Sequence, residues 1–238
     1  MSNIVDRLSV SPRVERIGDA ELWLGDCREL APTLGAVDVT ITDPPYGDVT
    51  HSGARTTTSG NRLVKLVKFA SITDDQFRRD CEMWLAMSSR WVVMTCEWQH
   101  AATLEAAGLP LVRLGVWIKP NGAPQFTGDR PGVGWEAVAV LHRDGKKRWN
   151  GGGHHAVWTY PKVSGEHPTQ KPLPLIQRWV ADFTDDGEVV FDPFMGSGTT
   201  GVAALSLGRR FLGVEMDQTY FDIACRRIER EASQGRLL

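Results

Sequence analysis

The stretch that decides the fold lies near the end of the chain and reads Val189-Val190-Phe191-Asp192-Pro193-Phe194-Met195-Gly196-Ser197-Gly198-Thr199-Thr200-Gly201. The apolar residues at its start predict a buried strand, and the glycines that follow predict a tight turn. A helix is expected from Thr199 to about Leu207. Because a ligand can lie directly against the backbone of such a turn, the stretch indicates an α/β fold with a ligand at the end of this strand.

A second strand is predicted downstream at 211–214, and it ends in Glu215. A carboxylate at this position can bind the two hydroxyl groups of a ribose, so a nucleoside-containing cofactor is expected. Gly196, Gly198 and Gly201 also satisfy the G-x-G-x-x-G pattern of nicotinamide-dependent oxidoreductases. That pattern alone is weakly specific, and an oxidoreductase stays open at this point.

Short apolar runs alternate with helical patterns along the whole chain, which is typical of an α/β fold. Strands are predicted at 21–24, 37–42, 91–95, 112–118, 135–141, 189–191 and 211–214. Helices are predicted from Thr73 to Ser88 and at 99–107, 174–183, 199–207 and 218–230. Too little chain follows Gly201 to complete a doubly wound sheet, so the missing strands must come from upstream. The order of the halves is therefore that of a circular permutation.

The predicted strand 37–42 leads directly into Asp43-Pro44-Pro45-Tyr46. The two prolines have no backbone N–H, so their carbonyls can accept hydrogen bonds from an amino group, and Tyr46 offers a ring for stacking. This combination suits a nucleobase taken out of its helix, although a strand followed by a proline-rich turn would explain the motif alone. If the strands ending at Thr42 and Phe191 are neighbours, Asp43 and Gly196 face one crevice.

The composition predicts a single domain over 1–238, in a cytoplasmic protein. The four cysteines are scattered, so neither a metal site nor a disulfide framework is expected, and no apolar run is long enough to span a membrane. The net charge is −2, but two clusters are basic. Arg55, Arg62, Lys65 and Lys68 form one cluster, and Arg143, Lys146, Lys147 and Arg148 form the other. Both are candidate DNA-binding clusters, with solvated loops as the alternative.

Three motifs occur in one order: Thr42-Asp43-Pro44-Pro45-Tyr46, then His167-Pro168-Thr169-Gln170-Lys171-Pro172, then the glycine stretch from Phe191. Together they resemble the beta-group amino-methyltransferases of DNA, and the resemblance runs from Leu24 to Glu215. It implies a Rossmann-like, S-adenosylmethionine-dependent methyltransferase fold, circularly permuted, with a mostly parallel seven-stranded sheet flanked by helices. It also implies double-stranded DNA as the partner. A homodimer is consistent with the small size, and a partner restriction nuclease is not implied.

The resemblance also implies roles for individual residues. The catalytic residues would be Asp43, Pro44, Pro45 and Tyr46. The cofactor-binding residues would be Asp26, Cys27, Asp43, His167, Thr169, Lys171, Asp192, Phe194, Gly196, Ser197, Gly198, Thr199 and Glu215. In this assignment Asp26 and Cys27 lie beside the adenine of the cofactor, Glu215 binds its ribose, and Thr169 and Lys171 hold its methionine carboxylate. A small buried thiol explains Cys27 equally well.

The activity implied is methyl transfer to N6 of a flipped-out adenine. N4 of cytosine is the alternative, because Ser-Pro-Pro-Tyr usually accompanies cytosine and Asp-Pro-Pro-Tyr adenine. Segment 47–70 is predicted to be a mobile lid and 121–166 to hold DNA-recognition insertions, where Trp135, Trp149 and Trp158 could contact bases, with core packing favoured for Trp135. Methyltransferases of protein glutamine or RNA generally place the glycine turn first. A DNA-binding module without turnover is a further alternative.

Overall fold

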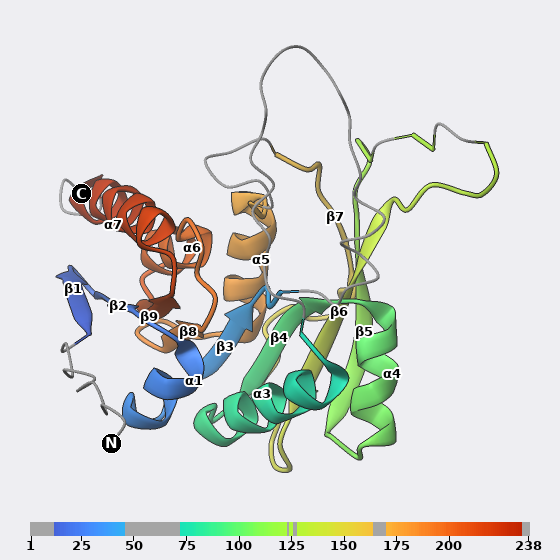
Figure 1. Ribbon diagram of the computed structural model, residues 1–238, viewed down its shortest axis with the longest axis horizontal. Helices are drawn as coiled ribbons and strands as arrows, with labels where there is room; N and C mark the ends of the chain where they lie inside the picture. Colours follow the sequence, from blue (N-terminus) through green and yellow to red (C-terminus); the bar gives the residue numbers. More distant parts are fainter. Residues whose placement is uncertain (1–11, 46–71, 123, 126–127, 164–169, 235–238) are drawn as a thin grey trace, which may run out of the picture.

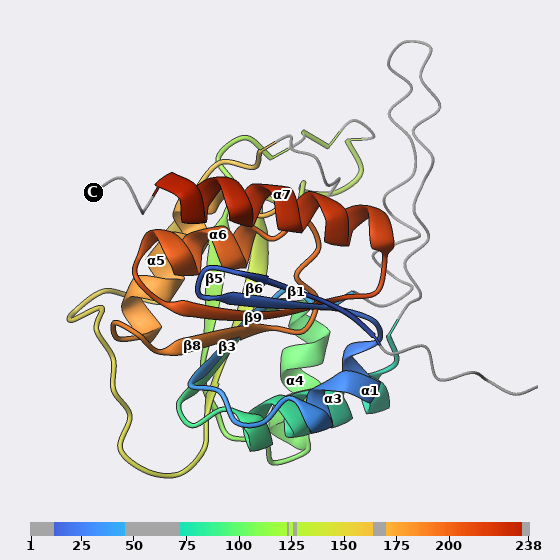
Figure 2. The same cartoon turned by 90° about the vertical axis from the view of Figure 1, so that its left-hand side faces the viewer.

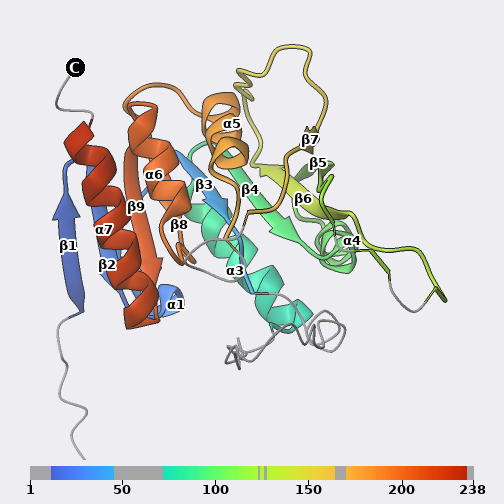
Figure 3. The same ribbon diagram turned by 90° about the horizontal axis from the view of Figure 1, so that it is seen from above.

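The computed structural model describes residues 12–45, 72–122, 124–125, 128–163 and 170–234. Nine strands in this part of the chain form one sheet in the order β1-β2-β9-β8-β3-β4-β6-β5-β7. Their bounds are Arg13–Ile17 (β1), Ala20–Leu24 (β2), Val39–Thr42 (β3), Trp91–Cys96 (β4), Leu111–Ile118 (β5), Trp135–His142 (β6), Val157–Thr159 (β7), Val189–Asp192 (β8) and Arg210–Glu215 (β9). Figure 3 shows the sheet from β1 at one edge to β7 at the other.

All seven predicted strands are present, and the sheet is extended by an unpredicted strand at each edge. The edge strand β1 pairs with β2 in an antiparallel hairpin whose two-residue turn contains Gly18 at φ 58°. The other edge strand, β7, has three residues and pairs with β5. The five neighbouring strands β2, β9, β8, β3 and β4 are parallel to one another, whereas β6 is antiparallel to both β4 and β5. A mostly parallel sheet was expected and is confirmed.

The helices cover both faces of the sheet. Their bounds are Cys27–Leu30 (α1), Ala31–Thr33 (η1, a 3-10 turn), Asp74–Met87 (α3), Trp98–Ala106 (α4), Leu173–Phe183 (α5), Thr199–Ser206 (α6) and Gln218–Gln234 (α7). In Figures 1 and 2, α5, α6 and α7 lie on one face and α1, α3 and α4 on the other. The five predicted helices are confirmed to within a few residues, and Thr73 caps α3 as predicted by accepting the Gln76 N–H at 3.2 Å.

Each face of the sheet has its own apolar core, because strand side chains alternate between the faces. On the α5 to α7 face, Trp158 and Trp179 pack edge to face with ring centroids 5.5 Å apart. On the α1 to α4 face, Phe77 and Trp84 are fully buried. The two cores enclose the central strands on both sides, which explains why all four residues of β3 are buried.

The pairing of β3 with β8 decides where the two main motifs meet. These strands are parallel neighbours, with Val39 opposite Val190 and Thr40 opposite Phe191. Because parallel strands end at the same edge, Asp43 and the glycine turn leave the sheet side by side. The Thr42 hydroxyl donates a hydrogen bond to Asp192 Oδ1 at 2.7 Å and ties the two strand ends together. The predicted convergence of two distant motifs is therefore confirmed.

Gly201 shows how closely α6 approaches its neighbours. A methyl group at this position would lie 2.5 Å from Cδ1 of Ile228 on α7 and 2.8 Å from the ring of Phe211 on β9. Both of these side chains are buried. Because the surroundings are closed, only a residue without a side chain fits here.

The Gly201→Ala variant is expected to lower the free energy of unfolding by about 1–3 kcal/mol, because the added methyl overfills the core. Helix propensity alone predicts the opposite sign, a gain of about 1 kcal/mol. Urea unfolding followed by circular dichroism measures the change. Gly153→Ala is the matched control, since nothing lies within 4 Å of a methyl group there.

Adding Ile228→Val removes the closest atom and should restore part of the lost stability. A Gly201→Ala variant as stable as the unaltered protein would contradict the close packing of α6.

Candidate active site

The site lies where the parallel strands of the sheet reach their carboxyl ends. Asp192 closes β8 and is buried, and its Oδ1 accepts hydrogen bonds from the Thr42 hydroxyl at 2.7 Å and from the Phe194 N–H at 3.1 Å. Burial raises the pKa of Asp192 to about 6, against hydrogen bonds from Thr200, Thr42 and Phe194 that lower it. Asp192 therefore works as a structural clamp between β3, β8 and the glycine turn.

The glycine turn connects β8 to α6 and is shaped by two left-handed residues. Gly196 has φ 51° and Gly198 has φ 79°, a conformation that side chains disfavour. A side chain at Gly198 would also meet Ala224 of α7, with the two Cβ atoms 2.9 Å apart. The turn therefore packs against α7 on one side and leads into α6 at Thr199.

Arg227 of α7 holds the glycine turn in place through hydrogen bonds. Its guanidinium donates to the Ser197 carbonyl at 2.6 Å, to the Ser197 hydroxyl at 2.9 Å and to the Thr199 hydroxyl at 3.3 Å. The Ser197 hydroxyl also lies 3.4 Å from the Gln170 side-chain oxygen. Arg227 was not among the predicted site residues, because an arginine in a charged terminal helix carries no local signal of such a contact.

Glu215, at the end of β9, faces the glycine turn. Its two carboxylate oxygens accept the Gly196 N–H at 2.9 Å and the Asp217 N–H at 2.8 Å. Burial raises the pKa of Glu215, while these backbone hydrogen bonds lower it. Met216 next to it is 72% exposed and was not predicted as a site residue.

The residues that follow β2 lie at this same end of the sheet, next to Glu215. The Gly25 N–H donates to the Glu215 carbonyl at 2.9 Å, and Asp26 caps α1 by accepting the Arg28 N–H at 2.9 Å. Cys27 is buried in the core, and burial raises the pKa of its thiol to about 12. The structure therefore brings Asp26, Gly196 and Glu215 together, and Cys27 packs in the core beside them, while its contact with a cofactor stays a prediction.

Asp43 follows β3 and is held by two donors from other elements. The Thr95 hydroxyl of β4 donates to its Oδ1, and the Lys171 ammonium lies 2.5 Å from its Oδ2. Lys171 is also 3.4 Å from Glu136 of β6, which in turn forms an ion pair with Lys119. Burial lowers the pKa of Lys171, but Asp43 and Glu136 outweigh it, so the net shift is upward.

Several predicted residues lie outside the described part of the chain: Tyr46, His167, Thr169, Arg55, Arg62, Lys65 and Lys68, together with the predicted lid 47–70. Of the methionine-carboxylate pair, only Lys171 is described, and its ammonium contacts Asp43 and Glu136. Thr95, Glu136 and Lys119 were not predicted, because each is distant in sequence from the motif it supports.

The second basic cluster lies at the opposite end of the strands from Asp43. Arg143 follows β6, whose last residue, His142, pairs with the first residue of β4. Arg148 forms ion pairs with Asp185 at 3.0 Å and with Glu188 at 2.7 Å, just before β8 begins. The structure therefore does not bring Arg143, Lys146, Lys147 and Arg148 to the site, and DNA contact by them stays a prediction.

Two of the tryptophan predictions are wrong. Trp158 is 1% exposed in the core of β7 and α5, so it is not available to contact bases. Trp135, for which core packing was favoured, is 40% exposed at the start of β6. Trp149 packs edge-on against Phe183, with ring centroids 4.9 Å apart.

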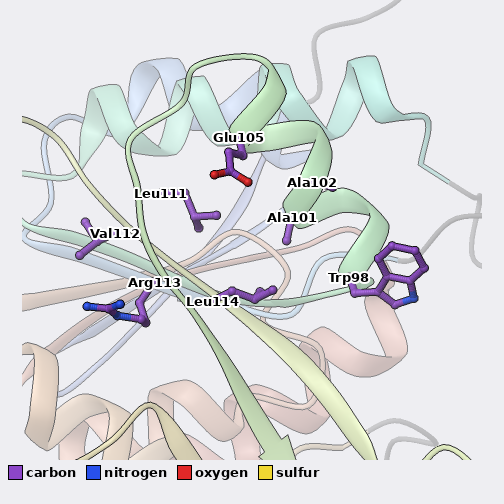
Figure 4. A pocket seen from close by; sticks show the side chains of 8 residues that line it. All are labelled: Trp98, Ala101, Ala102, Glu105, Leu111, Val112, Arg113 and Leu114. Atoms are coloured by element: carbon purple, nitrogen blue, oxygen red, sulfur yellow. The ribbon is translucent and has the colours of Figure 1, made fainter.

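A separate pocket of about 370 Å³ lies between α4 and β5 (Figure 4). It is lined by Trp98, Ala101, Ala102, Glu105, Leu111, Val112, Arg113 and Leu114, none of which is a predicted site residue. In the described residues, no cluster of three or more His, Cys, Asp or Glu side chains is arranged to hold a metal ion. Across these same ranges, no helix is long and apolar enough to cross a membrane.

Comparisons with known proteins identify the class. Residues 37–226 match the family model of DNA methylases, N6_N4_Mtase, so the chain belongs to that family. It is 29% identical over 224 residues to the type II methyltransferase M2.DpnII of Streptococcus pneumoniae, covering 82% of this chain and 84% of the relative. It is 28% identical over 231 residues to M2.LlaDCHI of Lactococcus lactis subsp. cremoris, covering 84% and 85%.

Solved structures show the same fold. The complex of M1.HpyAVI with S-adenosylmethionine superimposes with a TM-score of 0.65 at 24% identity, over 88% of this chain and 98% of that one. The cytosine-N4-specific PvuII methyltransferase gives a TM-score of 0.68 at 13% identity, over 92% and 91%. The predicted resemblance and the Rossmann-like methyltransferase fold are confirmed, and S-adenosylmethionine is the cofactor of this family.

The residues at the carboxyl ends of β8 and β9 fit S-adenosylmethionine. Glu215 supplies the carboxylate that ribose hydroxyls require, and the backbone of Gly196 and Gly198 is bare of side chains. Met216 offers an exposed, polarisable surface next to Glu215 for a flat ring. These residues would hold the cofactor with its nucleoside toward the end of β9.

The Asp192→Asn variant tests the buried carboxyl clamp. The folded-state pKa of Asp192, about 6, lies above its ordinary value of 3.8, so ionisation costs stability as the pH rises through this interval. Asparagine keeps an oxygen acceptor but cannot ionise. The stability of the variant relative to the unaltered protein should therefore increase between about pH 4 and about pH 7, by up to about 3 kcal/mol.

Urea unfolding of both proteins over this pH range measures the difference, in which all other titrating groups cancel. A difference that stays constant, or that moves against the variant as the pH rises, would show that Asp192 does not titrate in this way.

Proposed function

We propose that this protein is a site-specific DNA methyltransferase that transfers the methyl group of S-adenosylmethionine to N6 of an adenine flipped out of double-stranded DNA. The observation that supports this most is the pairing of β3 with β8, which brings Asp43, the first residue after β3, to the same end of the sheet as the glycine turn. One edge of the sheet then presents a carboxylate for the substrate amine and a cradle for the methyl donor.

The exocyclic amine of adenine is a weak nucleophile because its lone pair is delocalised into the ring. The Asp43 carboxylate and the Pro44 carbonyl would accept its two N–H groups and draw the nitrogen toward a tetrahedral arrangement. Because Thr95 and Lys171 hold the two oxygens of Asp43, the orientation of the carboxylate is fixed before substrate arrives. Each carboxylate oxygen has a further lone pair with which to accept an amine hydrogen.

The bound cofactor supplies an electrophilic methyl group on a sulfonium. As the amine attacks, the new carbon–nitrogen bond would form while the carbon–sulfur bond breaks and leaves a neutral thioether, and the nitrogen would then lose one proton. Positive charge develops on that nitrogen, so a neighbouring carboxylate stabilises the transition state more than the ground state. Asp43 is the residue in this role. Alignment by the strand ends of β3 and β8 supplies much of the remaining rate enhancement, because both reactants are held in line.

The cysteines favour amine methylation over methylation of a ring carbon, which needs a thiolate nucleophile. Cys27, Cys81 and Cys96 are buried, and burial raises the pKa of each thiol. Burial also raises the pKa of Cys225, on α7, to about 11. All four side chains are therefore thiols at neutral pH and serve as small apolar groups.

Adenine is proposed over cytosine because position 43 carries aspartate rather than serine. The fold does not distinguish the two bases, since the cytosine-N4-specific PvuII enzyme has it as well. For DNA recognition we propose the segments 47–70 and 121–166. The exposed Trp135, at the same sheet edge as Asp43, supports a contribution from the second segment.

The identity of the product tests the proposed function. Plasmid DNA incubated with the purified protein and S-adenosylmethionine should contain N6-methyladenine when its nucleosides are separated and weighed by mass spectrometry. Modification-aware sequencing of the same DNA should place the methyl groups in one sequence context. N4-methylcytosine as the only product would overturn the choice of base, and unmodified DNA would overturn the function.

Asp43→Asn should lower the single-turnover rate of methyl transfer by at least about a hundredfold, because the developing positive charge loses its carboxylate. Affinity for S-adenosylmethionine, measured by calorimetry, should stay within about tenfold. Asp222→Asn, which removes an exposed ion pair between α7 and Arg13 of β1, is the matched control and should keep the full rate. Near-normal turnover of Asp43→Asn would refute the proposed role.

A further inference from the structure

Four half-buried charges of alternating sign lead away from Asp43. The order is Asp43, Lys171, Glu136 and Lys119, with side-chain exposures of 26%, 10%, 18% and 13%. Lys171 bridges the two carboxylates, and Lys119 contacts Glu136 from the far side. The row is neutral in sum, which limits the cost of burying it.

The row spans three separate strands and is backed by an aromatic ring. Asp43 follows β3, Glu136 lies on β6, and Lys119 follows β5. The ring of Trp117 lies under both ammonium groups, with its centroid 4.8 Å from Lys119 Nζ and 5.8 Å from Lys171 Nζ. Both distances are within the range of cation–π attraction, so Trp117 gives the two lysines a common support.

We propose that Glu136 and Lys119 are positioning residues for methyl transfer: Glu136 shares the ammonium of Lys171 with Asp43, and Lys119 restrains Glu136. This inference rests on the proposed function, because it gives Asp43 the role of accepting the substrate amine. Sharing matters because an ammonium bound by Asp43 alone would occupy its Oδ2 more tightly. The carboxylate would then be a weaker acceptor for the amine.

The charges around Lys171 set the sign of the test. Asp43 faces it from the end of β3, Glu136 from β6, and Lys119 stands behind Glu136. Asp192, at the end of the neighbouring strand, interacts electrostatically with Asp43. Removing the charge of Glu136 should lower the pKa of Lys171, whereas removing that of Lys119 should not, because a neighbouring positive charge is lost.

The first measurement needs neither cofactor nor DNA. Lysine side chains labelled with ¹³C at Cε are titrated by NMR, and the Lys171 signal is assigned by its loss in Lys171→Arg. In Glu136→Gln the Lys171 midpoint should fall by about one pH unit or more, and in Lys119→Gln it should not fall. Equal midpoints in Glu136→Gln and the unaltered protein would overturn the inference.

The second measurement is the single-turnover rate of methyl transfer at neutral pH. Glu136→Gln should lower it about tenfold or more while affinity for S-adenosylmethionine stays within about threefold. Lys119→Gln should change the rate only when Glu136 is present, so the double variant should match Glu136→Gln. Strictly additive effects of the two substitutions would overturn the inference that Lys119 acts through Glu136.

Controls separate this inference from folding and from the proposed function. Glu82→Gln removes an acid of 51% exposure from an ion pair on α3 and should keep the full rate. Thermal unfolding of each variant identifies any general loss of structure, which would by itself lower the Lys171 midpoint, so midpoints are compared only between variants that stay folded over the titration. An unaltered protein that methylates no DNA defeats the proposed function, whereas active unaltered protein with an equally active Glu136→Gln defeats the inference alone.

Discussion

The parallel pairing of β3 with β8 is the constraint on which the rest of the structure depends. It sets two strand ends side by side at the centre of the sheet, and the bond from Thr42 to buried Asp192 fixes their register where they end. Asp43 continues from one strand and the glycine turn from the other. The carboxylate proposed to act on the substrate and the turn proposed to hold the cofactor are therefore positioned by the backbone hydrogen bonds of two neighbouring strands.

Around this pair, the remaining elements act as supports. Arg227 and Ala224 of α7 hold the glycine turn, Glu215 of β9 ties it to the end of β2, and Thr95 of β4 orients Asp43. The site is thus built from five adjacent strand ends. The contacts that a methyl group at Gly201 would make with Ile228 and Phe211 show how closely α6 packs against α7 and β9.

The sequence predicted what is encoded locally. The strand, glycine turn and helix around Gly196 were recognisable because their glycines and apolar run are consecutive, and Asp43 was recognisable from its two prolines. Arg227, Thr95 and Glu136 were not, since Thr199, Asp43 and Lys171, which they contact, lie 28 to 52 positions away and only the folded sheet joins them. Strand β7 and the burial of Trp158 were missed because a three-residue strand has no periodicity to detect.

The most direct test of the central claim is a crystal structure of the protein with S-adenosylmethionine and a DNA duplex containing its target base. We expect the cofactor on the turn at Gly196, its ribose at Glu215, and its methyl carbon in line with an amine nitrogen that donates to Asp43. A cofactor whose methyl group faces away from Asp43, or a target amine bound by another residue, would contradict it.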